Sequence, residues 1–116
     1  MSDNHPTPQW LKQHFEDWFD PCPLNNGELR EFDGLGDWED KSFVNMPYSK
    51  PIKWVERAIK EAEKGKRVVL LTRVDTSTKW WIKLVEAGFR VAFFNGRIKF
   101  SGEGSPNFAS AIWFSQ

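Results

Sequence analysis

The chain has 116 residues, of which 40% are apolar, 16% aromatic and 28% charged. This length suits one domain, and the composition excludes disordered and fibrous proteins. No apolar run reaches the roughly 18 to 20 residues that cross a bilayer, and the N-terminus lacks the basic-then-apolar form of a signal peptide. One cysteine, Cys22, and two histidines rule out an internal disulfide and argue against a structural zinc site. We therefore expect a single soluble, cytoplasmic domain over residues 1–116, with no metal and no membrane contact.

Acidic and basic residues are unevenly distributed, although the formal net charge is zero. Residues 1–49 hold ten Asp or Glu against three Lys or Arg, whereas residues 50–116 hold six against thirteen. Because cations hold phosphates and aromatic rings stack on bases, the basic half with Trp80 and Trp81 can form a nucleic-acid face. Solvated helix faces explain such a charge pattern equally well.

Two short elements and a long loop are predicted before residue 50. Apolar residues recur near three-and-four spacing between Pro8 and Trp18, which predicts a helix. Prolines and an Asn-Gly pair forbid regular structure after Phe19, and Pro47 ends a β-prone run because it cannot donate in a ladder. The acidic stretch between these runs predicts a loop of a length that is often functional. The expected elements are a helix over 8–18, a strand end at 18–19, a loop over 28–41 and a strand over 42–46.

Regular elements follow one another closely in the rest of the chain. One helix shows a single apolar face, with Glu56–Lys60 and Arg57–Glu61 as charge pairs four residues apart. A continuous apolar run after it predicts a strand buried on both faces. Asn95-Gly96 is the pair that best suits a tight two-residue hairpin. The expected elements are a helix over 51–64 capped by Gly65, a strand over 67–72, a helix capped by Thr76–Thr78 and closed near Gly88, a hairpin of 90–94 with 97–100, and a strand over 111–115.

The order of these elements predicts an α/β domain of three layers. The fully buried strand favours a mostly parallel sheet, because such strands have both faces covered by helices. The Asn95-Gly96 hairpin then turns the C-terminal end of the sheet antiparallel.

The string Asn45-Met46-Pro47-Tyr48-Ser49 lies where a predicted strand ends. Ligands of open α/β sheets bind at that carboxyl edge. An Asn side-chain oxygen and the next backbone carbonyl, held on a rigid turn, can accept both protons of an amino group and orient its lone pair. The adjacent Tyr48 can stack on the ring that bears the amine, as when a base is flipped out of its helix. A Pro-Tyr turn that merely packs against the sheet is the competing interpretation.

Other short sequence motifs follow one another along most of the chain. They are Thr7-Pro8, Phe19-Asp20-Pro21-Cys22-Pro23, Asp33-Gly34-Leu35, Phe43 to Ser49, Trp54, Val68 to Leu71, Thr76 to Trp81, Gly96 to Phe100 and Ser110 to Ile112. In this order and spacing the sequence resembles phage-type DNA N-6-adenine methyltransferases, within the larger group of S-adenosylmethionine-dependent amino methyltransferases.

The resemblance implies a catalytic motif of the form Asn or Asp, Pro, Pro, Tyr or Phe. It falls on Asn45, Met46, Pro47 and Tyr48 of this chain. Met46 stands where the family has its first proline; it supplies the same backbone carbonyl but lacks the fixed φ of proline. The implied fold is Rossmann-like. It is trimmed here, because only 24 residues lie between Asp20 and Asn45, too few for the two further strand and helix pairs of a complete cofactor-binding half.

S-adenosylmethionine is the cofactor that the resemblance implies. The contacts expected for it are Thr7, Pro8, Asp20, Pro21, Cys22 and Asp33. The segment over residues 23–27 replaces the glycine-rich turn that usually admits the methionine part of the cofactor. Competing interpretations make Asp20 a strand-end cap, Cys22 a buried thiol, and Asp33 or Asp37 part of a turn.

The implied partner is adenine-containing duplex DNA. The contacts expected for it are Ser49, Lys79, Trp80, Trp81, Arg97 and Lys99. Trp80 and Trp81 point about 100 degrees apart on a helix, so we expect one of them to be exposed beside Lys79. Arg97 and Lys99 alternate with apolar residues and are expected to share one face of the hairpin, where they can hold phosphates. Tryptophans packed on a neighbouring helix or a second subunit, and an ordinary solvated strand face, are the competing interpretations.

The sequence therefore predicts S-adenosylmethionine-dependent methylation of the exocyclic amine of adenine in DNA, in a host cytoplasm if a phage or prophage encodes the chain. A catalytically degenerate module that binds nucleic acid or a protein partner is one alternative. N-methylation of RNA or of a protein amide is another. Whether the chain forms a homodimer stays open.

Overall fold

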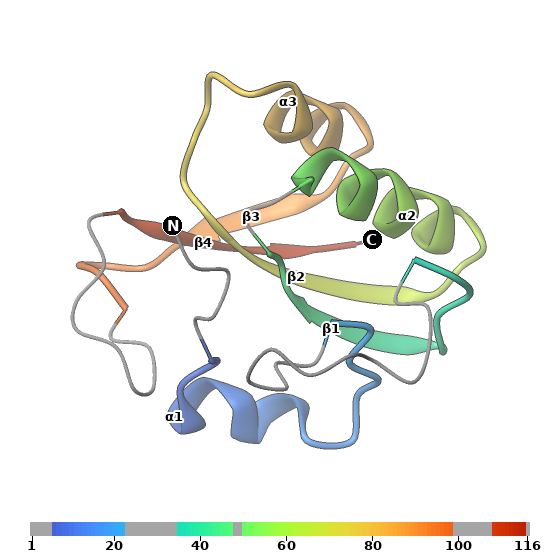
Figure 1. Cartoon of the computed structure of the whole chain (residues 1–116), viewed down its shortest axis with the longest axis horizontal. Helices are drawn as coiled ribbons and strands as arrows, with labels where there is room; N and C mark the ends of the chain where they lie inside the picture. Colours follow the sequence, from blue (N-terminus) through green and yellow to red (C-terminus); the bar gives the residue numbers. More distant parts are fainter. Residues whose placement is uncertain (1–5, 23–34, 48–49, 99–107, 116) are drawn as a thin grey trace.

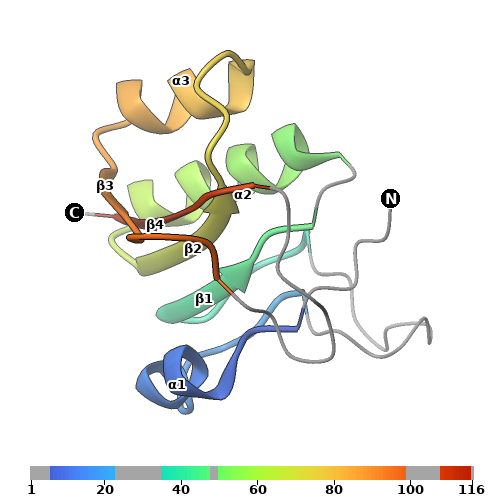
Figure 2. The ribbon, with the colours of Figure 1, turned by 90° about the vertical axis from the view of Figure 1, so that its left-hand side faces the viewer.

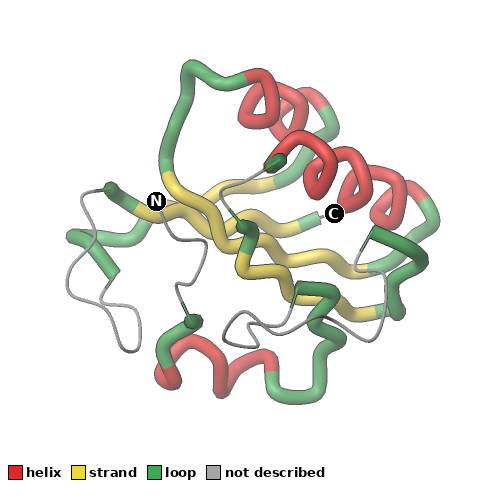
Figure 3. Tube along the Cα trace, in the orientation of Figure 1, coloured by secondary structure: helices red, strands yellow, loops and turns green. Residues whose placement is uncertain are grey.

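The computed structural model describes residues 6–22, 35–47, 50–98 and 108–115. Within these ranges the strands form one sheet, and helices lie on both of its faces (Figure 1, Figure 3). No helix of the described part is long and apolar enough to cross a membrane. The elements are α1 Gln9–Lys12, the 3-10 helix η1 Gln13–Phe15, β1 Lys41–Asn45, α2 Pro51–Glu63, β2 Arg67–Arg73, α3 Lys79–Glu86, β3 Arg90–Phe93 and β4 Ser110–Phe114.

The sheet is mixed, with the strand order β1-β2-β4-β3. β1 and β2 are parallel, from Lys41 opposite Arg67 to Asn45 opposite Leu71. β4 is antiparallel to both of its neighbours, β2 and β3. The predicted α/β arrangement is confirmed. The prediction of a mostly parallel sheet is wrong, because the last strand inserts between β2 and β3 and runs against both.

One further segment pairs with the side of β1 that faces away from β2. Phe19 forms an isolated parallel bridge with Ser42. The N–H of Phe19 donates to the carbonyl of Lys41, and the N–H of Phe43 donates to the carbonyl of Phe19, each at 2.9 Å. The strand end predicted at Trp18-Phe19 is thus a single bridge on the outer side of β1, which is otherwise an edge strand of the sheet.

Two apolar clusters lie on opposite faces of the sheet. α2 and α3 cover one face, and α1 with η1 covers the other (Figure 1, Figure 2). β2 supplies both clusters: Val68 and Leu70 belong to the one under α2 and α3, whereas Val69 and Leu71 belong to the one over α1. This alternation explains why the run is apolar without interruption, since successive strand residues point to opposite faces.

The predicted helices of the basic half are confirmed, with ends that differ by one or two residues. α2 has Pro51 at its first position, where the missing N–H of proline costs nothing. It ends just before Gly65, whose φ of 90° is a left-handed conformation that glycine adopts readily. Thr78 caps α3 as predicted, because its hydroxyl accepts a hydrogen bond of 3.3 Å from the N–H of Trp81.

The first helix is shorter than predicted. Helical structure begins after Pro8, which offers no side-chain cap, and ends at Phe15 instead of continuing to Trp18. The ring of Phe15 stacks on Phe43 of β1 at 4.5 Å and meets Trp18 edge-on at 5.2 Å. This packing turns the chain under the sheet, so that Phe19 reaches the side of β1.

The hairpin predicted for residues 90–94 with 97–100 is wrong in its second strand. β3 pairs with β4. Arg97 and Ile98 have no strand structure, and the last two residues of the predicted strand lie outside the described residues. Ile98 is 4% exposed and belongs to the cluster on the α1 face. The burial of Ile98 draws the chain away from β3, although Gly96 still provides the positive φ, 79°, expected at this turn.

A buried ion cluster ties the loop before β1 to α2. Glu61 has no exposed surface and lies 2.7 Å from Lys66, 2.9 Å from Lys64 and 3.3 Å from Arg57, which confirms the predicted Arg57–Glu61 pair. The backbone N–H of Trp38 also donates to Glu61 at 2.9 Å. Burial alone would raise the pKa of Glu61, but the hydrogen bonds from Lys66, Lys64 and Trp38 outweigh it and lower this pKa to about 2.

Replacing Glu61 with Gln should reduce the free energy of unfolding at neutral pH by about 2 kcal/mol, because the cations gathered around the buried carboxylate lose their counter-charge. The lowered pKa means that ionised Glu61 stabilises the folded state fully at pH values above 4.5. This stabilisation is lost as the pH falls from 4.5 towards about 2. The difference in free energy of unfolding between wild type and Glu61→Gln should therefore shrink as the pH falls below 4.5.

Urea unfolding at several pH values between 7 and 3 measures both effects. Glu63→Gln on the exposed side of α2 is the matched control and should change the free energy by less than about 0.5 kcal/mol. A difference that does not vary with pH would contradict the assignment.

Candidate functional site

Two predicted site segments meet at the carboxyl edge of the sheet. The parallel bridge between Phe19 and Ser42 sets the two chains side by side in the same direction. The turn that contains Cys22 therefore leaves the sheet next to the end of β1, where Asn45 lies. Cys22 and Met46 also belong to the same apolar cluster. This edge is the usual place for a ligand in an open α/β sheet.

Asn45 is held by a residue from the other end of the chain. Its Nδ2 donates a hydrogen bond of 3.1 Å to Oγ1 of Thr7, which is 38 residues away in sequence. Because the amide nitrogen points to Thr7, the amide oxygen points elsewhere, and it is the oxygen that an amino group would need as an acceptor. A predicted catalytic residue and a predicted cofactor residue are thus in direct contact.

Met46 and Pro47, the next two residues of the motif, are buried. Met46 is 5% exposed, and its backbone N–H donates to the carbonyl of Leu71 on β2 at 3.0 Å. This hydrogen bond carries the pairing of β1 and β2 one position beyond the end of β1. It fixes the backbone at Met46 by a different means from the ring of a proline.

The predicted cofactor segment forms a tight turn. The N–H of Cys22 donates to Oδ1 of Asp20 at 2.9 Å, and Pro21 and Cys22 are fully buried. Asp20 is exposed, so its carboxylate can close this turn and also contact a ligand at the edge of the sheet. The geometry agrees with the strand-end cap and the buried thiol considered for Asp20 and Cys22. Pro8, also predicted to contact the cofactor, is buried beside Thr7.

Four predicted site residues lie outside the described residues. They are Asp33 of the cofactor set, Tyr48 of the catalytic motif, and Ser49 and Lys99 of the nucleic-acid set.

The expectation that Trp80 or Trp81 is exposed is wrong. They are 3% and 6% exposed, because α3 lies over the sheet with both rings turned inward. Trp81 packs edge-on against Trp113 of β4 at 4.6 Å and stacks on Phe93 at 6.3 Å. The guanidinium of Arg73 lies 5.6 Å from the centre of the Trp80 ring. Neither indole offers a face on which a base can stack.

The two described cations of the predicted nucleic-acid set are exposed but do not share a surface element. Lys79 is the first residue of α3, and Arg97 follows the turn after β3. Arg97 is not part of a strand, and the expected face that it shares with Lys99 is not tested, because Lys99 lies outside the described residues.

The sequence model of the family described as DNA N-6-adenine-methyltransferase (Dam) matches residues 31–112 of this chain. The chain belongs to this family. The match includes the motif at Asn45 to Tyr48, and it begins after Thr7 and after Asp20. The resemblance inferred from the motifs is confirmed.

A curated relative from Haemophilus phage HP1 (strain HP1c1), named DNA N-6-adenine-methyltransferase, is 32% identical over 110 residues. The similarity covers 81% of this chain and 64% of the relative. The chain therefore spans less than two thirds of that protein. No solved structure matches the chain significantly.

One contact of the site and one group of cations near it are missing from the sequence-based predictions. The contact between Thr7 and Asn45 joins residues too far apart for any local pattern to reveal it. Lys53, Arg57 and Lys60 on the outward face of α2 show a four-and-three spacing in the sequence, but only Arg57 and Lys60 enter the sequence-based predictions, as members of charge pairs.

Replacing Thr7 with Val should reduce the free energy of unfolding by about 1 kcal/mol, because Val has the same shape and removes only the acceptor for Asn45. Thr7→Ser keeps the hydroxyl and should stay closer to wild type. Urea unfolding compares the three proteins. If Thr7→Val is as stable as wild type, the hydrogen bond does not hold the N-terminal segment on β1.

Proposed function

We propose that this chain methylates the exocyclic amine of adenine in DNA, with S-adenosylmethionine as the methyl donor. The observation that carries the proposal is the position of Asn45. It ends β1 at the carboxyl edge, its amide nitrogen is engaged by Thr7, and it lies within the segment that matches the methyltransferase family. The relative from phage HP1 bears the name of the same activity.

In this proposal Asn45 and its neighbour bind the target amine. The amide oxygen of Asn45 and the backbone carbonyl of Met46 accept the two N–H groups, which leaves the nitrogen lone pair directed at the methyl donor. Tyr48 stacks on the adenine ring, as the family motif implies. No strong base is required, because the amine loses a proton to solvent after transfer, and positioning supplies most of the catalysis.

The described residues at this edge suit a cofactor of this kind. When bound, S-adenosylmethionine supplies an activated methyl group. Thr7 and Asp20 offer polar atoms at the edge, while Pro21 and Cys22 give the adjoining turn a rigid, buried base. We propose that Thr7, Pro8 and the Asp20–Cys22 turn hold the cofactor beside Asn45, with Asp33 at its ribose.

We further propose that the fold is a trimmed Rossmann-like methyltransferase domain. The parallel order of Phe19, β1 and β2, followed by an antiparallel pair, supports this assignment. Only the stretch between Cys22 and β1 is available for the elements that a complete cofactor-binding half would add. We also propose that the protein acts in a host cytoplasm, which its phage relative supports.

Asn45→Ala should abolish methyl transfer to DNA, because the acceptor that orients the amine is removed. The assay mixes protein, methyl-labelled S-adenosylmethionine and unmethylated duplex DNA, then digests the DNA and identifies the labelled nucleoside. Labelled N-6-methyladenine from wild type alone is the expected result. Asn95→Ala, at an exposed turn, is the control and should keep full activity.

Equal labelling by wild type and Asn45→Ala would refute the proposed role of Asn45. Label on RNA or protein but not on DNA would assign the reaction to one of the other amine substrates. Absence of both labelling and cofactor binding would identify a degenerate member of the family.

Met46→Pro restores the family motif but removes the hydrogen bond to Leu71. We expect it to lower the free energy of unfolding by about 1 kcal/mol, since a buried carbonyl loses its donor. Urea unfolding measures this loss, and Met46→Leu is the control that keeps the N–H. A stabilised Met46→Pro protein would show that the ring constrains this turn better than the hydrogen bond does.

A further inference from the structure

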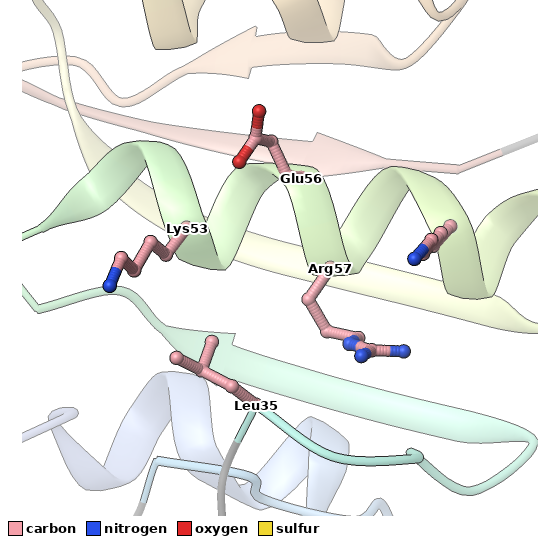
Figure 4. A pocket seen from close by; sticks show the side chains of 5 residues that line it. Leu35, Lys53, Glu56 and Arg57 are labelled. Carbon is pink, nitrogen blue, oxygen red and sulfur yellow. The ribbon is translucent and has the colours of Figure 1, made fainter.

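The outward face of α2 carries a row of cations beside a hollow in the surface. Lys53, Arg57 and Lys60 share this face because they are four and three residues apart, and we name them the α2 cation row. With Leu35 and Glu56 they line a hollow of about 470 Å³. In Figure 4, Arg57 extends toward the side on which Leu35 lies, whereas the carboxylate of Glu56 points away from both.

The acidic member of this lining pairs with another helix. Glu56 lies 3.8 Å from Lys83 of α3, and the predicted pair with Lys60 is not formed. Lys53 and Lys60 make no ion pair with any residue in the described ranges. Lys64, Lys66 and Lys83 around α2 face carboxylates, whereas the ammonium groups of Lys53 and Lys60 face none in the described ranges and can bind an anion.

Arg57 stands between them in a fixed position. Its guanidinium is held 3.3 Å from the buried carboxylate of Glu61, and its side chain is only 22% exposed. The guanidinium has five N–H donors in a rigid fork, so a bond to Glu61 leaves further donors for an anion. Asp37 lies 3.9 Å away but is 87% exposed, and such a contact is weak in water.

The row starts close to the candidate site. α2 begins six residues after Asn45, and Lys53 lies in its first turn. From Lys53 to Lys60 the helix rises about 10 Å. Three successive phosphates along one DNA strand span two steps, a rise of about 7 Å. The long side chains of the row can bridge the small difference between these two lengths.

We propose that the α2 cation row binds the phosphate backbone of the DNA strand next to the target adenine. Lys53, Arg57 and Lys60 contact successive phosphates, and Leu35 packs against the sugars between them. This inference rests on the proposed function for the choice of DNA as the partner.

The test is the salt dependence of binding to a fluorescent duplex of DNA. In Lys53→Gln/Lys60→Gln the slope of log affinity against log salt should become shallower by about two, because two phosphate contacts release fewer counterions. Binding of S-adenosylmethionine should not change. Arg57 stays intact, so the ion cluster around Glu61 is not disturbed.

Lys41→Gln/Arg90→Gln is the matched control. It removes the same charge from exposed residues at the amino ends of β1 and β3, on the opposite edge of the sheet. Its slope should stay near that of wild type. Equal slopes in the two double variants would overturn the inference, because they would show that only the net charge of the protein matters and not the position of the α2 cation row. A slope change with RNA but not with DNA would also overturn it.

The two proposals can fail separately. If Asn45→Ala still methylates DNA, the catalytic proposal fails, while the loss of slope in Lys53→Gln/Lys60→Gln would still support the row. If wild type methylates DNA and Lys53→Gln/Lys60→Gln keeps its slope, the cation row fails and the proposed function stands.

Discussion

The pairing of β1 on both of its sides is the constraint on which the rest of the structure depends. β2 lies along one side in parallel register, and Phe19 bridges to the other. These backbone hydrogen bonds bring segments from three parts of the chain to one edge. They place the Asp20–Cys22 turn and Asn45 together, and only a long-range sheet contact can do this. The side chain of Asn45 is then fixed by Thr7, so its backbone and its amide are held by independent contacts.

Met46 illustrates how a motif can change a residue and keep a geometry. A proline at this position would fix φ through its ring and would leave Leu71 without a donor. Here the N–H of Met46 binds that carbonyl, so a hydrogen bond between neighbouring strands constrains the turn. The backbone carbonyl of residue 46, which the proposed chemistry uses, is present with either residue. Methionine in place of the family's proline therefore changes how the backbone of the turn is held, but it keeps the carbonyl that the proposed chemistry uses.

The sequence correctly predicted the helices and strands whose ends are determined by residues close to them in the chain. Periodicity and caps gave α2, α3 and β2 nearly to the residue, since Pro51, Gly65 and Thr78 act within one turn of their own positions. The errors all involve contacts distant in sequence. The turn at Asn95-Gly96 has the residues for a hairpin, but burial of Ile98 decides where the chain goes. No local pattern shows that both adjacent tryptophans of α3 are covered, or that β4 inserts between two earlier strands.

The charge asymmetry of the sequence is used in two different ways in the fold. Part of the basic half neutralises buried or neighbouring acids: Lys64 and Lys66 at Glu61, and Lys83 at Glu56. These pairs stabilise structure and offer little to a ligand. Because the net charge is zero, long-range attraction of a polyanion is weak, and the proposed contact with DNA depends on cations gathered in one place. The outward face of α2 gathers them next to the edge that holds Asn45, so one helix both follows the proposed catalytic turn and presents charge beside it.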